Sequence, residues 1–415
     1  MRIISGARRG ILTLAYGDRA YVQMAKSLAV SLKLHNPTIP RVVVTESSDP
    51  ALRRLYDLVI PVNSSFGRGV AQKLHLNRYS PFTETLFIDA DSLVVKPIEW
   101  LWDLFSDVAF GVVGRQITEG NWFMDVPRTL KQFGLKSIPQ FNGGLYYFTN
   151  DARSTAVFET SGSILRDYEG LGLHPFRGGV NDEPIVALAL AIHGIPPVDD
   201  QGRAMRTPIG IRGRLDVDVL RGVCRFNKQG TEVEPAIIHF AGDDAEGFCY
   251  WRERLKLLLG HRITLKPVVS YAVNALTNPA NLMYQRWQLV KESWKMNAAA
   301  RRLRAMIPRQ SAFILVNQDA WPADQWASGR RTFPFLEKDG RYMGIPEDDE
   351  TAIHELERLR REGAAFIAFA SPALWYLDHF SGLRQYLYET YRCVAEDERL
   401  VLFQLEQPSR SLASM

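Results

Sequence analysis

The sequence has little cysteine, no long apolar run and only a small overall charge. Its three cysteines, Cys224, Cys249 and Cys393, lie far apart in a chain of 415 residues, and they fit neither a disulfide framework nor a zinc site. We therefore expect packing residues in a reducing compartment. The apolar stretch from Ile11 to Tyr16 is too short for a signal-peptide core, and no run approaches the length of a membrane span. These absences predict a cytoplasmic protein.

Length and composition favour a folded protein with more than one part. With 46% hydrophobic residues, the chain can bury a sizeable core, and its length suits two domains or one domain with an appendage. We expect a first domain over residues 1–250, a basic helical linker over 251–310 and a small α/β domain over 311–415.

The first ninety residues alternate between strand-like and helix-like patterns. Apolar runs predict strands, periodic apolar positions such as Val22, Ala25 and Leu28 predict helices, and His35-Asn36-Pro37 ends the first helix. This order predicts a Rossmann-like, nucleotide-binding α/β sheet, with ligands beyond the carboxyl ends of its strands. The predicted strands cover 10–15, 41–45, 58–62 and 85–89, and the predicted helices include 50–56 and 68–78.

Asp89-Ala90-Asp91 is the most informative motif. It follows the apolar run Leu86–Ile88 and precedes another, Leu93–Val95. Carboxylates two residues apart at a strand end project to the same side, where they can bind a divalent cation that also holds a diphosphate. Such motifs also occur by chance as solvated turn acids, but strand-like flanks would draw this pair inward, where an unpaired carboxylate is costly.

Together with four further segments, the motif resembles the retaining glycosyltransferases of family 8, the glycogenin-like enzymes. The order and approximate spacing match over roughly residues 10 to 245. The resemblance implies a GT-A fold and transfer of a hexose or N-acetylhexosamine from a UDP-sugar. The four further segments are Lys73-Leu74-His75, Phe141-Asn142-Gly143-Gly144, Asn181-Asp182-Glu183-Pro184 and His239-Phe240-Ala241-Gly242.

The resemblance also implies a role for individual residues. Asp89, Asp91 and His239 would bind the metal, and such a mixed oxygen and nitrogen set suits Mn²⁺ (or Mg²⁺). Lys73 would stabilise the leaving diphosphate, and Asp182 would hold sugar hydroxyls. The residues implied in donor binding are Ala15, Tyr16, Tyr21, Lys73, Ala90, Asn142, Gly143, Gly144, Asp182 and Gly242.

Two positions depart from the family pattern. Glu183 stands where family 8 has glutamine, and the pair Asp182-Glu183 also resembles the Asp-Glu of the blood-group glycosyltransferases. A carboxylate beside the anomeric carbon could stabilise an oxocarbenium ion or form a covalent intermediate, so we expect Glu183, Asp182 and Lys73 to be catalytic, with retention. After Gly242 the family has a lysine and a Pro-Trp pair, whereas this chain has an acidic run, 243–246. Arg212 or Arg214 could supply the missing charge.

Structural interpretations stay open for several of these residues. Tyr16 and Tyr21 could be core aromatics, Asp182 and Glu183 could be helix-start acids, and the glycine pair could form a tight turn. A nucleotidyltransferase is less well supported, because the loop after the first predicted strand lacks a glycine-rich phosphate cradle.

The stretch Arg252–Arg309 is strongly basic. It contains about twelve basic and two acidic residues, so the rest of the chain is acidic overall. Interleaved aromatics such as Trp251 and Tyr271 suit peripheral contact with an anionic membrane, at its inner face, or a solvated helical linker. No motif for nucleic acid accompanies the charge.

The last hundred residues predict a second α/β unit. Strands are expected over 313–316, 364–369 and 400–405, and helices over 349–363 and 374–391. Phe333-Pro334, the segment 373–379 and Tyr391-Arg392 resemble a small domain attached to some bacterial glycosyltransferases.

The sequence therefore predicts a metal-dependent glycosyltransferase with a saccharide or glycolipid acceptor. The alternative is a non-catalytic module that binds sugar nucleotides or glycans. Neither the sugar, the acceptor nor the oligomeric state follows from the sequence.

Overall fold

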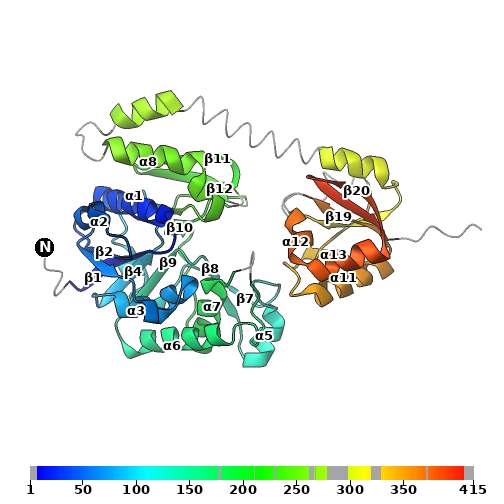
Figure 1. Cartoon of the computed structure of the whole chain (residues 1–415), viewed down its shortest axis with the longest axis horizontal. Helices are drawn as coiled ribbons and strands as arrows, with labels where there is room; N and C mark the ends of the chain where they lie inside the picture. The colour runs from blue at the N-terminus through cyan, green and yellow to red at the C-terminus, as the bar shows by residue number, and fades with distance from the viewer. Residues whose placement is uncertain are drawn as a thin grey trace, which may run out of the picture. The chain divides into compact units, whose positions relative to one another are not determined.

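The computed structural model describes residues 7–175, 179–209, 211–228, 230–260, 266, 268–277, 298–318, 329–370 and 373–405. The chain divides into two compact units (Figure 1). Unit 1 contains residues 1–118, 129–173 and 180–285, and unit 2 contains residues 119–128, 174–179 and 286–415. Within the described ranges, no helix is both long and apolar enough to cross a bilayer.

Unit 1 is built on a six-stranded sheet with the order β3-β2-β1-β4-β9-β6. The first four of these strands are parallel, whereas β9 is antiparallel to β4 and β6 is antiparallel to β9. The predicted α/β class is therefore confirmed. The strands are β1 (Arg9–Ala15), β2 (Arg41–Thr45), β3 (Leu58–Pro61), β4 (Glu84–Ile88), β6 (Phe110–Gly111) and β9 (Leu145–Thr149).

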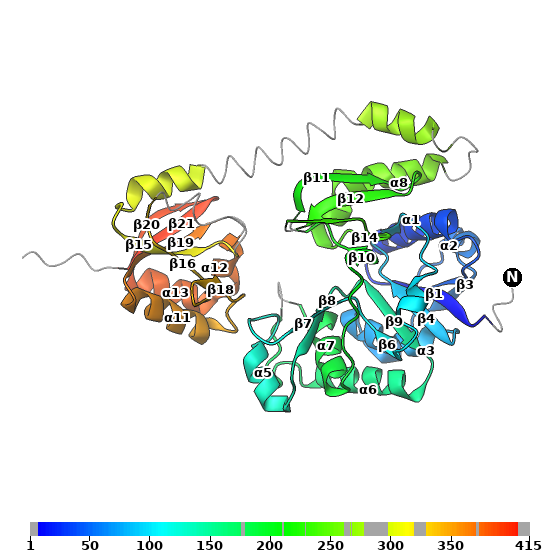
Figure 2. The ribbon, with the colours of Figure 1, turned by 180° about the vertical axis from the view of Figure 1, so that it is seen from behind.

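Helices cover both faces of this sheet (Figure 2). Successive side chains of β4 point to opposite faces: Leu86 shares a core with Leu28 of α1, whereas Phe87 stacks on Tyr146 of β9. Asp18 caps α1 by accepting a hydrogen bond from the Ala20 amide. The helices of unit 1 are α1 (Arg19–His35), α2 (Pro50–Leu55), α3 (Leu76–Tyr79), α4 (Leu101–Leu104), α5 (Val126–Phe133, partly in unit 2), α6 (Ala152–Arg166), α7 (Asp182–Ile192) and α8 (Phe248–Gly260).

Three smaller sheets complete unit 1. A sheet of order β10-β14-β5 joins distant parts of the chain, and the antiparallel sheet β11-β12-β13 lies beside α8 (Figure 1). The third pairs β7 with β8. Their strands are β5 (Ser92–Val94), β7 (Gly114–Ile117), β8 (Ile138–Phe141), β10 (Met205–Arg206), β11 (Ile211–Asp218), β12 (Val223–Lys228), β13 (Thr231–Val233) and β14 (Ile237–His239).

The helix predicted over 68–78 is wrong in type. The segment is a 3-10 helix, η2 (Gly69–His75), followed by the single turn of α3. Its start has glycines with positive φ at Gly67 and Gly69, which disfavour a regular α-helix, and Gln72 bonds back to the Asn63 and Gly67 carbonyls. Two further 3-10 helices lie in unit 1, η1 (Ser64–Phe66) and η3 (Gly242–Glu246).

Unit 2 has a mixed five-stranded sheet of order β16-β15-β19-β21-β20. The predicted helix over 374–391 is broken into three pieces, because Phe380 takes φ −92° and ψ 78° between two of them. The elements are β15 (Ala312–Val316), β16 (Thr332–Pro334), β17 (Glu337–Lys338), β18 (Arg341–Tyr342), α11 (Asp349–Arg361), β19 (Ala364–Ala370), η4 (Ala373–Trp375), α12 (Tyr376–His379), α13 (Ser381–Thr390), β20 (Arg392–Asp397) and β21 (Leu400–Gln404).

Part of the basic stretch lies outside the described residues. Residues 261–265, 267 and 278–297 are among those not described, whereas 268–277 and 298–306 are helical. Two of its predicted surface cations are buried instead: Arg252 and Lys256 of α8 are 4% and 0% exposed. These two residues therefore cannot contribute to a membrane-facing surface.

Candidate functional site

Strand pairing brings the conspicuous segments to one edge of the central sheet. Because β1 and β4 are parallel neighbours, the loop after Ala15 and the motif after Ile88 emerge together. The antiparallel strand β9 begins at the same edge, and the Asp89 amide donates to the Gly144 carbonyl at 3.0 Å. His239 of β14 lies opposite Ser92 of β5, next to Asp91. Segments that lie far apart in the sequence, from Ala15 to His239, therefore meet at one edge of the sheet.

Asp89, Asp91 and His239 form a group that could hold a metal ion. One ligand atom from each residue lies within 4.8 Å of the others. His239 Nε2 is 3.0 Å from Asp91 Oδ1. Burial raises the pKa of Asp89, the Lys73 ammonium opposes that shift, and the Asp91 carboxylate adds to it. Two carboxylates and one imidazole, half-buried or buried, fit a divalent transition metal.

Asn142 fixes the orientation of His239. Its Oδ1 accepts a hydrogen bond from the Gly144 amide at 3.1 Å and lies 2.6 Å from His239 Nδ1. Nδ1 must therefore be the protonated nitrogen, which leaves Nε2 directed at Asp91 as the ligating atom. Burial lowers the pKa of His239, but the Asp91 carboxylate raises it overall. The group therefore fits a metal, and the hydrogen bond that orients its histidine is already made.

Lys73 bridges the metal group to the start of α7. Its Nζ donates to Asp89 Oδ2 at 2.8 Å, to Asp182 Oδ2 at 3.0 Å and to the Gly143 carbonyl at 3.1 Å. Burial alone would lower the pKa of Lys73, but the Asp182 and Asp89 carboxylates raise it overall. Lys73 is therefore a permanent cation inside the site. Its neighbour His75 stacks on Phe66 with ring centroids 4.3 Å apart and serves packing.

Two donors hold the Asp182 carboxylate. Besides Lys73, it accepts a hydrogen bond from the Tyr146 hydroxyl at 2.5 Å. It is 8% exposed, so its charge is desolvated but compensated by two donors. Tyr146 is a residue of the candidate site that sequence reasoning missed. Its position opposite Phe87 across β4 and β9 could have indicated that it faces away from α1.

Glu183 sits in the first turn of α7. Asn181 caps the helix by accepting a hydrogen bond from the Glu183 amide. Glu183 Oε1 accepts from the Gly143 amide at 2.8 Å and contacts Asn142 Nδ2 at 3.4 Å. Burial, followed by the nearby Asp182 charge, raises the pKa of Glu183 to about 7. A buried carboxylate whose pKa is raised beside other charged groups is a common feature of catalytic sites.

The two glycines of the 141–144 segment are sterically required. A Cβ on Gly143 would lie 2.8 Å from Asp182 Oδ2, and one on Gly144 would lie 2.4 Å from His239 Nδ1. Neither distance is tolerated without displacing the functional side chain. The glycines thus allow β9 to start directly beneath the site, and the tight-turn interpretation does not account for these contacts.

The residues expected to bind the nucleoside lie at the same edge. Ala15 at the end of β1 and Ala90 of the metal motif belong to one buried hydrophobic cluster. Tyr21 is 42% exposed, and burial, with the charges of Asp91 and Asp89, raises its pKa. Tyr16 is half-buried. Tyr21 is therefore not a core aromatic.

The segment after His239 leads into a short 3-10 helix. Gly242 has φ +61° and begins η3. Arg214 is exposed and 3.9 Å from Asp216, and the side chain of Arg212 lies outside the described residues. Lys228 of β12 is a cation that sequence reasoning missed. Its Nζ donates to the Thr207 carbonyl and hydroxyl.

The electrostatics of Lys228 set it apart from the surface lysines. Burial, followed by repulsion from Arg206, lowers the pKa of Lys228 to about 8, and the Asp244 carboxylate of η3 opposes this. An anion close to Lys228 would relieve that penalty.

Comparison with known proteins gives similarity to solved structures only. No protein-family profile and no curated protein matches the chain. The chain is similar to galactosyltransferase LgtC in complex with donor and acceptor sugar analogs, at 18% identity over 60% of this chain and 94% of that one, with a TM-score of 0.42. It is similar to mouse xyloside xylosyltransferase 1 at 14% identity over 48% and 87%, with a TM-score of 0.34. The bifunctional glycosyltransferase WbbM matches at 10% identity over 58% and 47%, with a TM-score of 0.39.

Proposed function

We propose that the chain is a metal-dependent GT-A glycosyltransferase that moves a hexose or N-acetylhexosamine from a UDP-sugar to a saccharide or glycolipid. The observation that carries this proposal is the meeting of two groups. The first is a possible metal group, which consists of Asp89, Asp91 and His239. The second is the pair of carboxylates at the start of α7, and Lys73 bridges the two groups by donating to both Asp89 and Asp182. Diphosphate binding needs the first group, and chemistry at an anomeric carbon needs the second.

Binding of the donor would follow from the charges of the site. Mn²⁺ or Mg²⁺, held by Asp89, Asp91 and His239, would offset the negative charge of a diphosphate. Lys73 would exchange part of its contact with Asp89 for a phosphate oxygen, and so stabilise charge on the leaving group. Tyr16 and Tyr21 would contact the nucleoside beside the backbone of Ala15 and Ala90, whose side chains are buried.

The chemical step would belong to the start of α7. Asp182, fixed by Tyr146 and Lys73, would hold sugar hydroxyls. Glu183, fixed by the Gly143 amide, would present its second oxygen to the anomeric carbon. That carboxylate could form a glycosyl bond as the bond to UDP breaks, and the acceptor hydroxyl would then displace it, which gives retention.

Lys228 would replace the basic residue that family 8 carries after its metal-binding histidine. It supplies a partly desolvated ammonium near η3, the segment that follows His239. We prefer it to Arg214, which is largely exposed.

Membership of family 8 and the assignment of residues 311–415 to a domain found on bacterial glycosyltransferases are part of this proposal. The shared order of five segments supports the first, and the strands and helices of unit 2 are compatible with the second. Cytoplasmic location with peripheral membrane contact would bring the enzyme to a glycolipid acceptor.

A screen for donor hydrolysis tests the proposed function. Purified protein with Mn²⁺ should slowly hydrolyse one or a few members of a panel of nucleotide sugars and release UDP, because water can replace a missing acceptor. Chelation of the metal should abolish release. Binding of UDP-sugars without hydrolysis or transfer to any glycan would favour the non-catalytic module, and no binding at all would contradict both.

A further inference from the structure

A basic groove lies in unit 1 between α1, α2 and α8. Its cavity volume is about 660 Å³, and the three helices are neighbours in both views (Figure 1, Figure 2). Five cations line it, and no carboxylate is among its lining residues. We call it the basic groove. The five cations are Lys26, Lys33, Arg54, Arg254 and Lys266.

Most of this charge is not neutralised by described residues. Lys26 pairs with Asp49 at 2.6 Å, but Lys33, Arg54 and Lys266 form no ion pair with any described residue. The ammonium of Lys266 is close enough to α1 to lower the pKa of His35 further, after burial has lowered it. Like charges gathered around one cavity raise the local positive potential and favour an anionic ligand.

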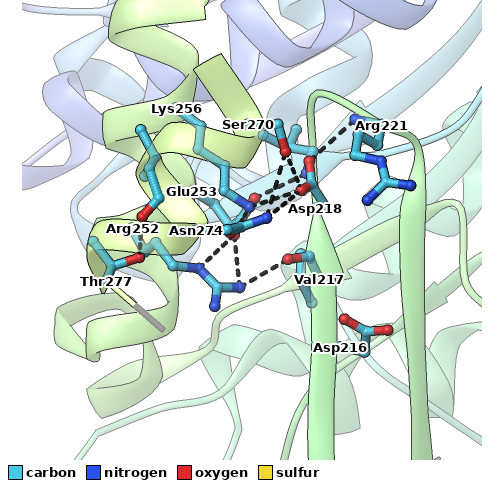
Figure 3. Close-up of polar contacts among 12 residues, drawn as sticks. Asp216, Val217, Asp218, Arg221, Arg252, Glu253, Lys256, Ser270, Asn274 and Thr277 are labelled. Carbon is cyan, nitrogen blue, oxygen red and sulfur yellow. Dashed lines mark hydrogen bonds and ion pairs between the residues drawn. The ribbon is translucent and has the colours of Figure 1, made fainter. Parts of the chain in front are cut away.

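Buried polar contacts fix the position of α8, one of the helices that form the groove. A buried ionic cluster ties α8 to β11 and to the helix over 268–277 (Figure 3). Lys256 contacts Glu253 at 2.9 Å and Asp218 at 3.1 Å, and Asp218 also accepts hydrogen bonds from Ser270 and Asn274. The adjacent Arg254 is anchored on Ser27 of α1 at 3.2 Å. These contacts hold α8, and with it Arg254, against α1.

Apolar side chains line the groove together with the cations. Val30, Leu34, Leu55, Leu257 and Leu258 are among its lining residues, and Leu258 is 64% exposed. Cations and an exposed apolar side chain around one groove suit a ligand with both an anionic head and an apolar chain.

We propose that the basic groove binds the headgroup of an acidic phospholipid at a membrane surface, with the exposed side chain of Leu258 entering the apolar boundary. A second copy of this chain is a poor occupant, because a two-fold contact would place the same cations opposite one another. Nucleic acid offers no apolar partner for the exposed Leu258. The proposal rests on the proposed function only in that a glycolipid acceptor would be found at such a surface.

Vesicle flotation of the full chain tests this site. Binding should require phosphatidylglycerol in phosphatidylcholine vesicles and should weaken as salt is added. The triple variant Lys33→Gln, Arg54→Gln, Lys266→Gln should lower the partition constant at least about tenfold, because each basic residue near an anionic surface contributes to binding. Leu258→Ser should lower it as well.

A matched triple variant distinguishes binding at this groove from a general effect of net charge on vesicle binding. Lys131, Lys136 and Arg153 are exposed cations on other parts of unit 1, so their change to Gln removes the same charge, and it should alter partition less than about twofold. Equal losses in the two triple variants would overturn the site. Displacement by soluble glycerol phosphate together with full partition of Leu258→Ser would overturn a lipid ligand, because the phosphate group alone would then account for binding. Donor hydrolysis without vesicles should be unchanged in the groove variant. Vesicle partition therefore tests the groove and donor hydrolysis tests the proposed function, and either proposal can fail without the other.

Discussion

Glu183→Gln is expected to cut turnover of the donor by at least about tenfold, which corresponds to about 1.4 kcal/mol of barrier. The change keeps the shape of the side chain and a group that can accept from the Gly143 amide, but it removes the charge. A charge at the anomeric carbon stabilises the transition state more than the ground state, so donor affinity should change little. Steady-state kinetics of hydrolysis or transfer give both quantities.

The pH profile gives an independent readout of Glu183. Burial raises its pKa to about 7, so the carboxylate is protonated below that pH and charged above it. Turnover by the wild type should therefore rise through about pH 7, and the Glu183→Gln variant should lose this rise. Glu232→Gln, an exposed change on β13, is the matched control. Full turnover in Glu183→Gln, or an inverted anomeric centre in the product, would leave Glu183 as a helix-start residue only.

Lys256→Met is expected to lower the free energy of unfolding by about 3–5 kcal/mol. Lys256 is fully buried between Glu253 and Asp218, and its removal would leave two desolvated carboxylates without their shared cation. Burial already raises the pKa of Glu253. Urea denaturation followed by circular dichroism measures the loss.

Arg225→Met is the control for this change. Arg225 and Glu234 form an ion pair at 2.6 Å, with side chains 64% and 50% exposed, and solvent-exposed pairs contribute little to stability. If Lys256→Met lowered the free energy of unfolding as little as Arg225→Met, the buried cluster would not depend on the charge of Lys256. The cluster would then not be what fixes α8.

Local patterns predicted the elements that carry the site. The strand from Arg41 to Thr45 and the end of the first helix before Asn36 follow from apolar runs and a proline stop, and both agree with the structure. The end of β4 was expected one residue beyond its actual end at Ile88. Because parallel strands share their carboxyl edge, the closeness of the first loop to Asp89 could be inferred without coordinates.

Contacts made by tertiary packing could not be inferred in this way. Tyr146 reaches Asp182 only because β9 runs antiparallel to β4, and Lys228 is partly buried because of the fold around Thr207. Arg252 and Lys256 were expected on the surface. Sequence alone does not show that they form buried ion pairs with Glu253 and Asp218. The roles of Lys73, Asp182 and Glu183 in catalysis stay predictions.

Calorimetry of UDP binding tests the central claim most directly. Asp89, Asp91 and His239 should bind metal and nucleotide together, because a bridging cation offsets both carboxylate and diphosphate charge. UDP should bind in the presence of Mn²⁺, and this binding should disappear after chelation and in Asp91→Ala, but persist in the exposed control Asp107→Ala. Tight binding of UDP without metal, or unchanged binding in Asp91→Ala, would contradict the account.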